Sequence, residues 1–242
     1  MSSTEEQIEK KSVYITAGTK GGVGKSSAAV YFSNALTEVG KIPVNIDCDS
    51  ENATFKRFLE GRAISIDLSQ PYAMDEMISI IDSSKLHNFV IDLKAGTGDE
   101  TLKWLEDVPL EDMKNEGIIV YLIGCITSDP DSTQTFLNWA GRLNNRVEYI
   151  VVFNEIDGND FSFYEQEAEE FEQLANPGKI VIPRLHEIYN TVLNQLGLCL
   201  YDYLQGDIEI KDKAFRGRVP HTRLYRYLRN IIEQISEVVA NG

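Results

Sequence analysis

The feature that most constrains the fold is a glycine-rich loop between an apolar run and a helical pattern. The loop reads Lys20-Gly21-Gly22-Val23-Gly24-Lys25-Ser26 and is followed by Ser27. It comes after the β-branched run Val13–Ala17 and opens the amphipathic segment Lys25–Val39. A strand, a glycine-rich turn and a helix N-terminus together form a phosphate site, because free backbone N–H groups and the helix dipole face the anion.

Each residue type within this loop has its own predicted role in binding a nucleotide. The glycines allow backbone N–H groups to point inward, Lys25 can reach the β- and γ-phosphates, and the Ser26 hydroxyl can ligate Mg²⁺. The predicted phosphate-binding positions are Gly21, Gly22, Val23, Gly24, Lys25, Ser26 and Ser27.

The rest of the chain alternates apolar runs with helical patterns, which predicts one α/β domain over residues 12–242. The runs are continuous rather than alternating, as in strands buried on both faces. We therefore expect a mostly parallel sheet flanked by helices on both faces, preceded by a flexible lead-in over Met1–Lys11. The expected strands are Val13–Ala17, Pro43–Ile46, Asn88–Leu93, Ile118–Ile126, Val147–Phe153 and Lys179–Ile182. The expected helices are Lys25–Val39, Asp131–Leu143, Phe163–Leu174 and about Thr222–Val239.

Two of these runs end in aspartates. The run that ends at Ile46 is followed by Asp47 and Asp49, which strand alternation points to the same side, toward the carboxyl edge of the sheet. The run Asn88–Leu93 carries Asp92 in the Walker B form, in which the carboxylate orients Mg²⁺ through water. These patterns make Ser26 and Asp92 candidate metal ligands.

The loop differs from the usual phosphate-loop pattern, because Thr19 occupies the first glycine position and Lys20 follows it. In this it resembles the deviant Walker A motif of the ParA/MinD family. The resemblance implies a single-domain P-loop NTPase that binds ATP or ADP with Mg²⁺ and slowly hydrolyses ATP. It also implies a homodimer with two ATP molecules sandwiched between subunits, in which Lys20 reaches the partner's nucleotide. Positive charge there stabilises the transferring phosphoryl group.

The same resemblance assigns further roles. It implies that Asp49 positions the attacking water, that Asp47 lies near Mg²⁺ and its waters, and that Lys20, Lys25 and Asp49 are the catalytic set. Asn154 matches the family's asparagine that reads the adenine edge, and Pro183 matches its second base-contacting segment. Ser50 and Glu155 depart from the family pattern, which usually has a proline and a basic residue there.

Charge along the chain bears on partners. The formal net charge is −15, yet the segment 211–229 holds seven basic residues and one acidic residue. The arginines at the start of the last expected helix could neutralise phosphates of nonspecific DNA, and the alternative is a solvated arginine face paired with acidic neighbours. The candidate DNA-binding residues are Arg216, Arg218, Arg223, Arg226 and Arg229.

Several functions fit these patterns. The first is a cytoplasmic ATPase that binds the nucleoid when ATP-bound and positions a plasmid or a large assembly such as a carboxysome. A small adaptor with a basic segment would stimulate its hydrolysis. The second is a recruitment switch in conjugative transfer or membrane-linked assembly that does not bind DNA. The third is a small-molecule kinase, for which Lys20 would be dispensable. The last expected turns carry no lysine or arginine, which disfavours a membrane anchor.

Overall fold

The computed structural model describes residues 10–241 apart from 19, 50–52, 95, 97 and 207. Most of the expected N-terminal lead-in therefore lies outside the described residues, as do Thr19 and Ser50, two of the departures noted in the nucleotide motifs. The first described element already begins at Lys11.

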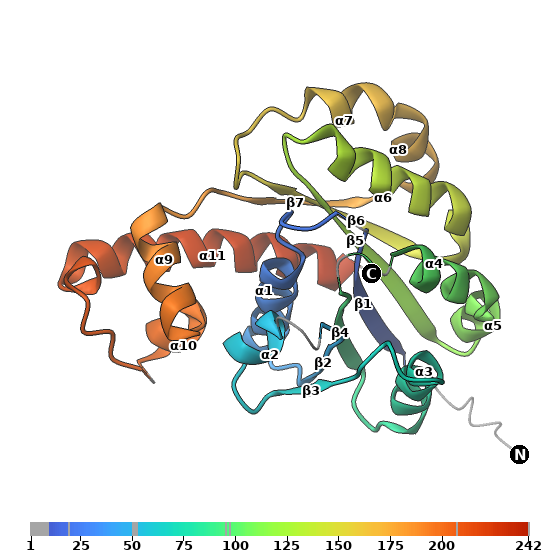
Figure 1. Cartoon of the computed structure of the whole chain (residues 1–242), viewed down its shortest axis with the longest axis horizontal. Coiled ribbons are helices and arrows are strands. Elements are labelled where there is room, and N and C mark those ends of the chain that lie inside the picture. Colours follow the sequence, from blue (N-terminus) through green and yellow to red (C-terminus); the bar gives the residue numbers. More distant parts are fainter. Residues whose placement is uncertain are drawn as a thin grey trace, which may run out of the picture.

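The core is a seven-stranded sheet in the order β3-β2-β4-β1-β5-β6-β7 (Figure 1). All of its described strand pairs are parallel, as the continuous apolar runs predict. The strands are β1 (Lys11–Ala17), β2 (Pro43–Asp47), β3 (Ala63–Ser65), β4 (Asn88–Asp92), β5 (Ile118–Ile126), β6 (Glu148–Asn154) and β7 (Gly178–Ile182).

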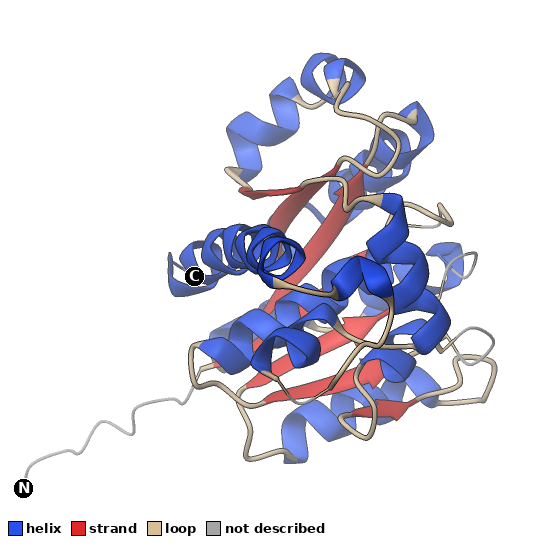
Figure 2. Ribbon diagram, turned by 90° about the vertical axis from the view of Figure 1, so that its left-hand side faces the viewer, coloured by secondary structure: helices blue, strands red, loops and turns tan. Residues whose placement is uncertain are grey.

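Helices connect the strands and cover both faces of the sheet (Figure 2). The longer ones are α1 (Lys25–Glu38), α3 (Ala73–Ser83), α4 (Gly98–Asp107), α6 (Pro130–Leu143), α9 (Glu187–Leu196) and α11 (Arg218–Asn241). The shorter ones are α2 (Thr54–Phe58), α5 (Leu110–Asn115), α7 (Ser162–Glu167), α8 (Glu169–Ala175), α10 (Leu200–Gln205) and the 3₁₀ turns η1 (Asn144–Arg146) and η2 (Lys213–Phe215).

Alternate residues of the central strands feed two separate cores. On β1, Val13 and Ile15 face a core closed by α3 to α8, while Tyr14 faces a second core closed by α1, α2, α10 and α11. Because successive side chains of a strand point to opposite faces and both faces are covered, the central strands are mostly apolar. This two-faced burial confirms the expected α/β class.

Two helical predictions differ from the structure. The expected helix Phe163–Leu174 is broken at Ala168, where φ −99° and ψ 3° leave the helical range and the side chain is buried. The last helix starts at Arg218 rather than near Thr222, with Pro220 in its first turn. A proline is tolerated there because the first N–H groups of a helix have no partner within it.

Candidate nucleotide site

The glycine-rich loop joins β1 to α1, and one of its glycines is required by a neighbouring side chain. Gly24 caps α1 with φ +94°. The Asn154 amide donates a hydrogen bond from Nδ2 to the Val23 carbonyl at 2.8 Å. A Cβ at position 24 would lie 2.1 Å from the same Nδ2, so only glycine fits without displacing Asn154.

Lys25 points into the loop. Its side chain is buried, and Nζ donates to the Lys20 carbonyl oxygen at 2.6 Å. Burial lowers the pKa of this ammonium, partly offset by the charges of Asp92 and Asp49 nearby. The loop therefore closes around a cation at its centre, as a polyphosphate site requires.

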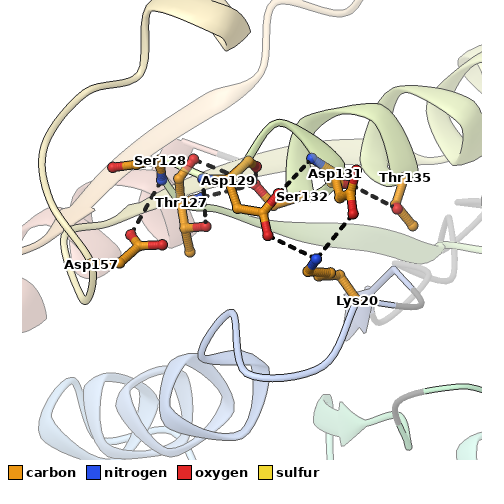
Figure 3. Close-up of polar contacts among 8 residues, drawn as sticks. All are labelled: Lys20, Thr127, Ser128, Asp129, Asp131, Ser132, Thr135 and Asp157. Atoms are coloured by element: carbon orange, nitrogen blue, oxygen red, sulfur yellow. Dashed lines mark hydrogen bonds and ion pairs between the residues drawn. The ribbon is translucent and has the colours of Figure 1, made fainter.

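Lys20 points in a different direction, away from the loop and toward the N-terminus of α6 (Figure 3). Its Nζ lies 2.7 Å from Asp129 Oδ2 and 3.0 Å from Asp131 Oδ2. These hydrogen bonds, with Asp129 the stronger partner, raise the pKa of Lys20 and lower that of Asp129. The two lysines of the loop thus serve separate sites, and Lys20 is held by carboxylates of its own chain.

Asp129 owes its position to the local sequence of the β5–α6 turn. Its side chain accepts from the Asp131 backbone N–H and caps α6, with Pro130 at the first position (Figure 3). The Asp129 N–H in turn donates to the Thr127 hydroxyl, and the Ser132 hydroxyl donates to the Asp129 carbonyl. The capping role follows from the sequence, whereas the contact with Lys20 could not be foreseen, because it joins residues far apart along the chain.

The predicted acidic residues meet at the carboxyl edge of the sheet. Asp47 and Asp92 are opposite each other in the β2–β4 register. Asp92 is buried and accepts a hydrogen bond from the Thr16 hydroxyl at 2.9 Å, and the Ser26 hydroxyl is near enough to lower its pKa. Burial raises the pKa of Asp92 to about 6, more than the two hydroxyls lower it. A buried carboxylate of this kind gains from a neighbouring cation.

The arrangement fits Mg²⁺, which prefers oxygen ligands and retains several waters beside phosphates. Ser26 and Asp92 supply a hydroxyl and a carboxylate beside Lys25. Within the described ranges, no three His, Cys, Asp or Glu side chains are grouped to hold a metal ion by themselves. Such a site would therefore depend on the nucleotide phosphates for its remaining ligands.

Asp47 also has a structural role that could not be predicted from the sequence. Its two carboxylate oxygens accept backbone N–H groups, Oδ1 from Asp49 at 2.9 Å and Oδ2 from Lys56 at 2.8 Å. Asp47 thereby fixes the start of the loop that carries Asp49 and the N-terminal turn of α2. Its approach to Mg²⁺ and the part of Asp49 in positioning water stay predictions.

The two expected base-contacting positions come together at the ends of β6 and β7. Asn154 is opposite Ile182 in the register, and the Glu155 N–H donates to the Ile182 carbonyl at 3.0 Å. Pro183 follows directly and is half-buried. Asn154 also braces the phosphate loop through Val23, so it joins the expected adenine side to the phosphate side.

Thr16 is a site residue that sequence reasoning missed. Its hydroxyl donates to Asp92 and accepts from the Leu93 N–H at 3.1 Å, which ties β1 to the end of β4. The available signal was a hydroxyl residue in an otherwise apolar run, four residues before the phosphate loop begins at Lys20.

The arginines of the basic segment are not equivalent. Arg216, Arg218, Arg223 and Arg226 are exposed. Arg229 instead pairs with Glu38 of α1 at 2.9 Å and with Glu233 at 3.3 Å. Arg223 also lines a pocket of about 300 Å³ whose other polar or aromatic members are Arg184, His186, Tyr189 and Tyr227.

None of the helices in the described part of the chain has both the length and the apolar character needed to cross a bilayer. The three cysteines, Cys48, Cys125 and Cys199, are buried and free.

Comparison with known proteins identifies the family. A model of the CobQ/CobB/MinD/ParA nucleotide binding domain matches residues 14–198. A search of curated proteins found no match.

Solved structures share the fold at low sequence identity. The MinD cell division protein of Aquifex aeolicus has 14% identity and a TM-score of 0.57, with 96% of this chain and 98% of that chain covered. A protein described as a plasmid partition protein, from Borrelia burgdorferi B31 and bound to AMPPNP, has 13% identity and a TM-score of 0.53, covering 96% and 99%.

The ATP complex of a Cyanothece McdA variant has 15% identity and a TM-score of 0.52, covering 96% and 97% of the two chains. At such identities these structures establish the fold alone, while the domain match covers most of the chain, including the phosphate loop and Asp92. The chain therefore belongs to the CobQ/CobB/MinD/ParA family of nucleotide-binding domains.

Proposed function

We propose that this protein is a ParA-type ATPase that binds Mg²⁺-ATP, forms an ATP-sandwich dimer and positions a cargo along nonspecific DNA. The observation that carries the proposal is the divergence of the two loop lysines. Lys25 Nζ is directed into its own phosphate loop, whereas Lys20 Nζ is bonded outside it to Asp129 and Asp131. A lysine directed out of its own site can serve the nucleotide of a second subunit once it leaves these carboxylates.

In the dimer, Lys20 supplies positive charge to the partner's nucleotide, and Lys25 serves its own. Ser26 and Asp92 hold Mg²⁺, which neutralises phosphate charge, and Asp49 orients the attacking water. Asn154 and Pro183 contact the adenine. Hydrolysis is slow until a small adaptor protein stimulates it.

The DNA surface lies at the start of α11. Arg216, Arg218, Arg223 and Arg226 are exposed, and no described acidic side chain pairs with the last three of them. Arg184 and Arg223 line one pocket together with two tyrosines, so aromatic rings lie beside the cationic side chains. A dimer presents two such surfaces, so binding is independent of sequence and weakens steeply with salt. The protein would be cytoplasmic and associate with the nucleoid in the ATP state.

Anisotropy of a labelled nonspecific duplex tests the proposal, with ATP, ADP or no nucleotide and at low and moderate salt. We expect binding only with ATP and Mg²⁺, lost in Arg223→Ala/Arg226→Ala. Lys85→Ala/Lys103→Ala is the matched control, because it removes the same charge from exposed residues outside α11.

A second candidate is a nucleotide-dependent recruitment switch, in conjugation or membrane-linked assembly, that does not touch DNA. The strong negative charge outside residues 211–229 favours it. ATP binding with no DNA binding under any of these conditions would contradict the positioning role and support this switch.

A further inference from the structure

A groove outside the nucleotide site lies between α6 and α8. It encloses about 640 Å³, and its apolar lining includes Leu137, Ala140, Val147, Phe171 and Leu174. Figure 1 shows α8 and α6 beside each other, at the edge of the sheet formed by β6 and β7. The groove touches the first residues of β6, whereas the phosphate loop is contacted by Asn154 at the other end of that strand.

The groove exposes apolar surface that the fold does not use. Leu174 is 81% exposed at the last turn of α8, and the neighbouring Phe171 and Leu137 are only partly buried. A leucine so exposed contributes little to folding. Its place beside a groove with an apolar lining is typical of an interaction surface.

The rim of the groove is acidic. Glu167 and Glu170 line it and are exposed, and no described cation pairs with either of them. Glu148 and Lys114 also line it and neutralise each other in an ion pair at 2.8 Å, which leaves Glu167 and Glu170 as the unpaired charges of the described rim. The surrounding segment 155–175 holds eight acidic residues and no lysine or arginine. The surface therefore attracts cations around an apolar centre.

This charge selects the class of partner. DNA and anionic membranes carry the same sign as the rim and are repelled. A helix with leucine-like residues on one face and lysine or arginine on the other matches both the apolar lining and the rim. We propose that the α6–α8 groove is a docking surface for a basic amphipathic helix of a partner protein.

The proposal deepens the proposed function, on which it rests for the partner's role, by placing the adaptor on this groove. α6 links the two sites, because its N-terminus holds Lys20 through Asp129 and Asp131 and its C-terminal half lines the groove. A helix docked on α6 thus contacts the same element that holds Lys20.

The test uses a labelled peptide of leucine and lysine, with the leucines at the three- and four-residue spacing of one helix face, and a scrambled peptide of the same composition. Binding to the full chain is measured by anisotropy without nucleotide, at an ionic strength of about 0.15 M. Leu174→Ser is compared with Leu196→Ser, which is 53% exposed and outside the groove. Glu167→Lys/Glu170→Lys is compared with Glu76→Lys/Glu237→Lys, which changes the same charge at exposed residues elsewhere.

We expect the amphipathic peptide to bind about tenfold more tightly than the scrambled one, the effect of burying about one leucine. Leu174→Ser should remove this preference and Leu196→Ser should not. The Glu167→Lys/Glu170→Lys variant should lose more affinity than its control.

Three results would each overturn the docking proposal. They are equal affinity for the two peptides, an intact preference in Leu174→Ser, and equal losses of peptide affinity in the two charge-reversal variants. Since no nucleotide or DNA is present, the result is independent of the duplex assay. Loss of ATP-dependent DNA binding with an intact peptide preference would overturn the positioning role alone.

Discussion

At the scale of single residues, the site combines buried charge with backbone that tolerates few substitutions. Asp92 is the clearest case, because it is a buried carboxylate between two hydroxyls with a pKa of about 6. Its ionised form is unfavourable in the nucleotide-free chain, and the same property makes it receptive to a cation. Stability and function therefore oppose each other at this residue.

Asp92→Asn should stabilise the nucleotide-free protein at neutral pH. The pKa of Asp92 is higher in the folded state than in the unfolded state. The free energy of unfolding of the wild type therefore falls as the pH rises from about 4 to about 6, and it stays at this lower value above pH 6. Urea unfolding measures the free energy of unfolding of both proteins at pH 5 and pH 7.5. Between these two values of pH it should fall by about 1 kcal/mol less in the variant than in the wild type.

The exposed carboxylate variant Asp75→Asn is the control and should unfold like the wild type at both values of pH. Asp92→Asn should also lose Mg²⁺-dependent ATP binding. A variant that is no more stable than the wild type at pH 7.5 would contradict the burial of an ionised Asp92.

Gly24→Ala should disable the phosphate loop. The residue has φ +94°, and a Cβ would collide with Asn154 Nδ2, so either the loop or Asn154 must move. We expect ATP affinity to fall by more than about tenfold, measured by titration calorimetry. Gly22→Ala is a useful comparison, since its φ is also positive but no atom lies within 4 Å of the added Cβ. Equal losses in the two variants would show that the contact with Asn154 is unimportant.

The carboxylates that hold Lys20 should restrain it in the monomer. Asp129→Asn/Asp131→Asn removes both charges, so the pKa of Lys20 should fall and its amine should react faster with an acylating reagent, read by mass spectrometry. ATP-dependent dimer formation should strengthen by about two- to fivefold, a small effect because exposed ion pairs are weak. Weaker dimer formation would mean that the carboxylates position Lys20 rather than restrain it.

At the scale of elements, the apolar runs and the loop predicted the central sheet closely. The predicted run at β5 matches the structure at both ends, and the predicted phosphate loop does join β1 to α1. Buried strands can be predicted in this way because both faces demand apolar residues. β3 was not predicted, since three residues that are mostly exposed carry no such pattern.

The break between α7 and α8 was hidden for a different reason. Glutamate and alanine favour helix throughout this stretch, so the sequence pattern reads as one helix. Ala168, Tyr164 and Phe171 nevertheless contribute to one core, and the break at Ala168 accommodates this packing. Tertiary contact thus overrides local propensity, as it also does in the pairing of Lys20 with α6.

Within α11, Arg229 should matter less for DNA than its neighbours. It is bound to Glu38 and Glu233, whereas Arg223 and Arg226 are exposed. In the duplex assay we expect Arg229→Ala to lose less affinity than Arg223→Ala or Arg226→Ala, and to lower the free energy of unfolding by less than about 1 kcal/mol. An equal loss of DNA affinity in all three variants would place Arg229 in the same surface.

At the scale of the whole molecule, acidic and basic surfaces lie on different elements, apart from the candidate nucleotide site. The carboxyl edge of the sheet holds the candidate nucleotide site, α11 presents the arginines, and α6 with α8 forms the acidic groove. The nucleotide motifs made the first of these predictable from sequence, and charge indicated the second. The groove could not be predicted, because it depends on how distant helices pack.

We propose above that ATP brings two copies of this chain together, with Lys20 of each copy at the nucleotide of the other. Light scattering coupled to size exclusion measures it most directly, with Mg²⁺ and either ATP or ADP. We expect the mass of the 27.3 kDa monomer with ADP and twice that mass with ATP. The Lys20→Ala variant should stay a monomer with ATP. A wild-type protein that binds ATP and stays monomeric, or a Lys20→Ala variant that dimerises equally well, would contradict it.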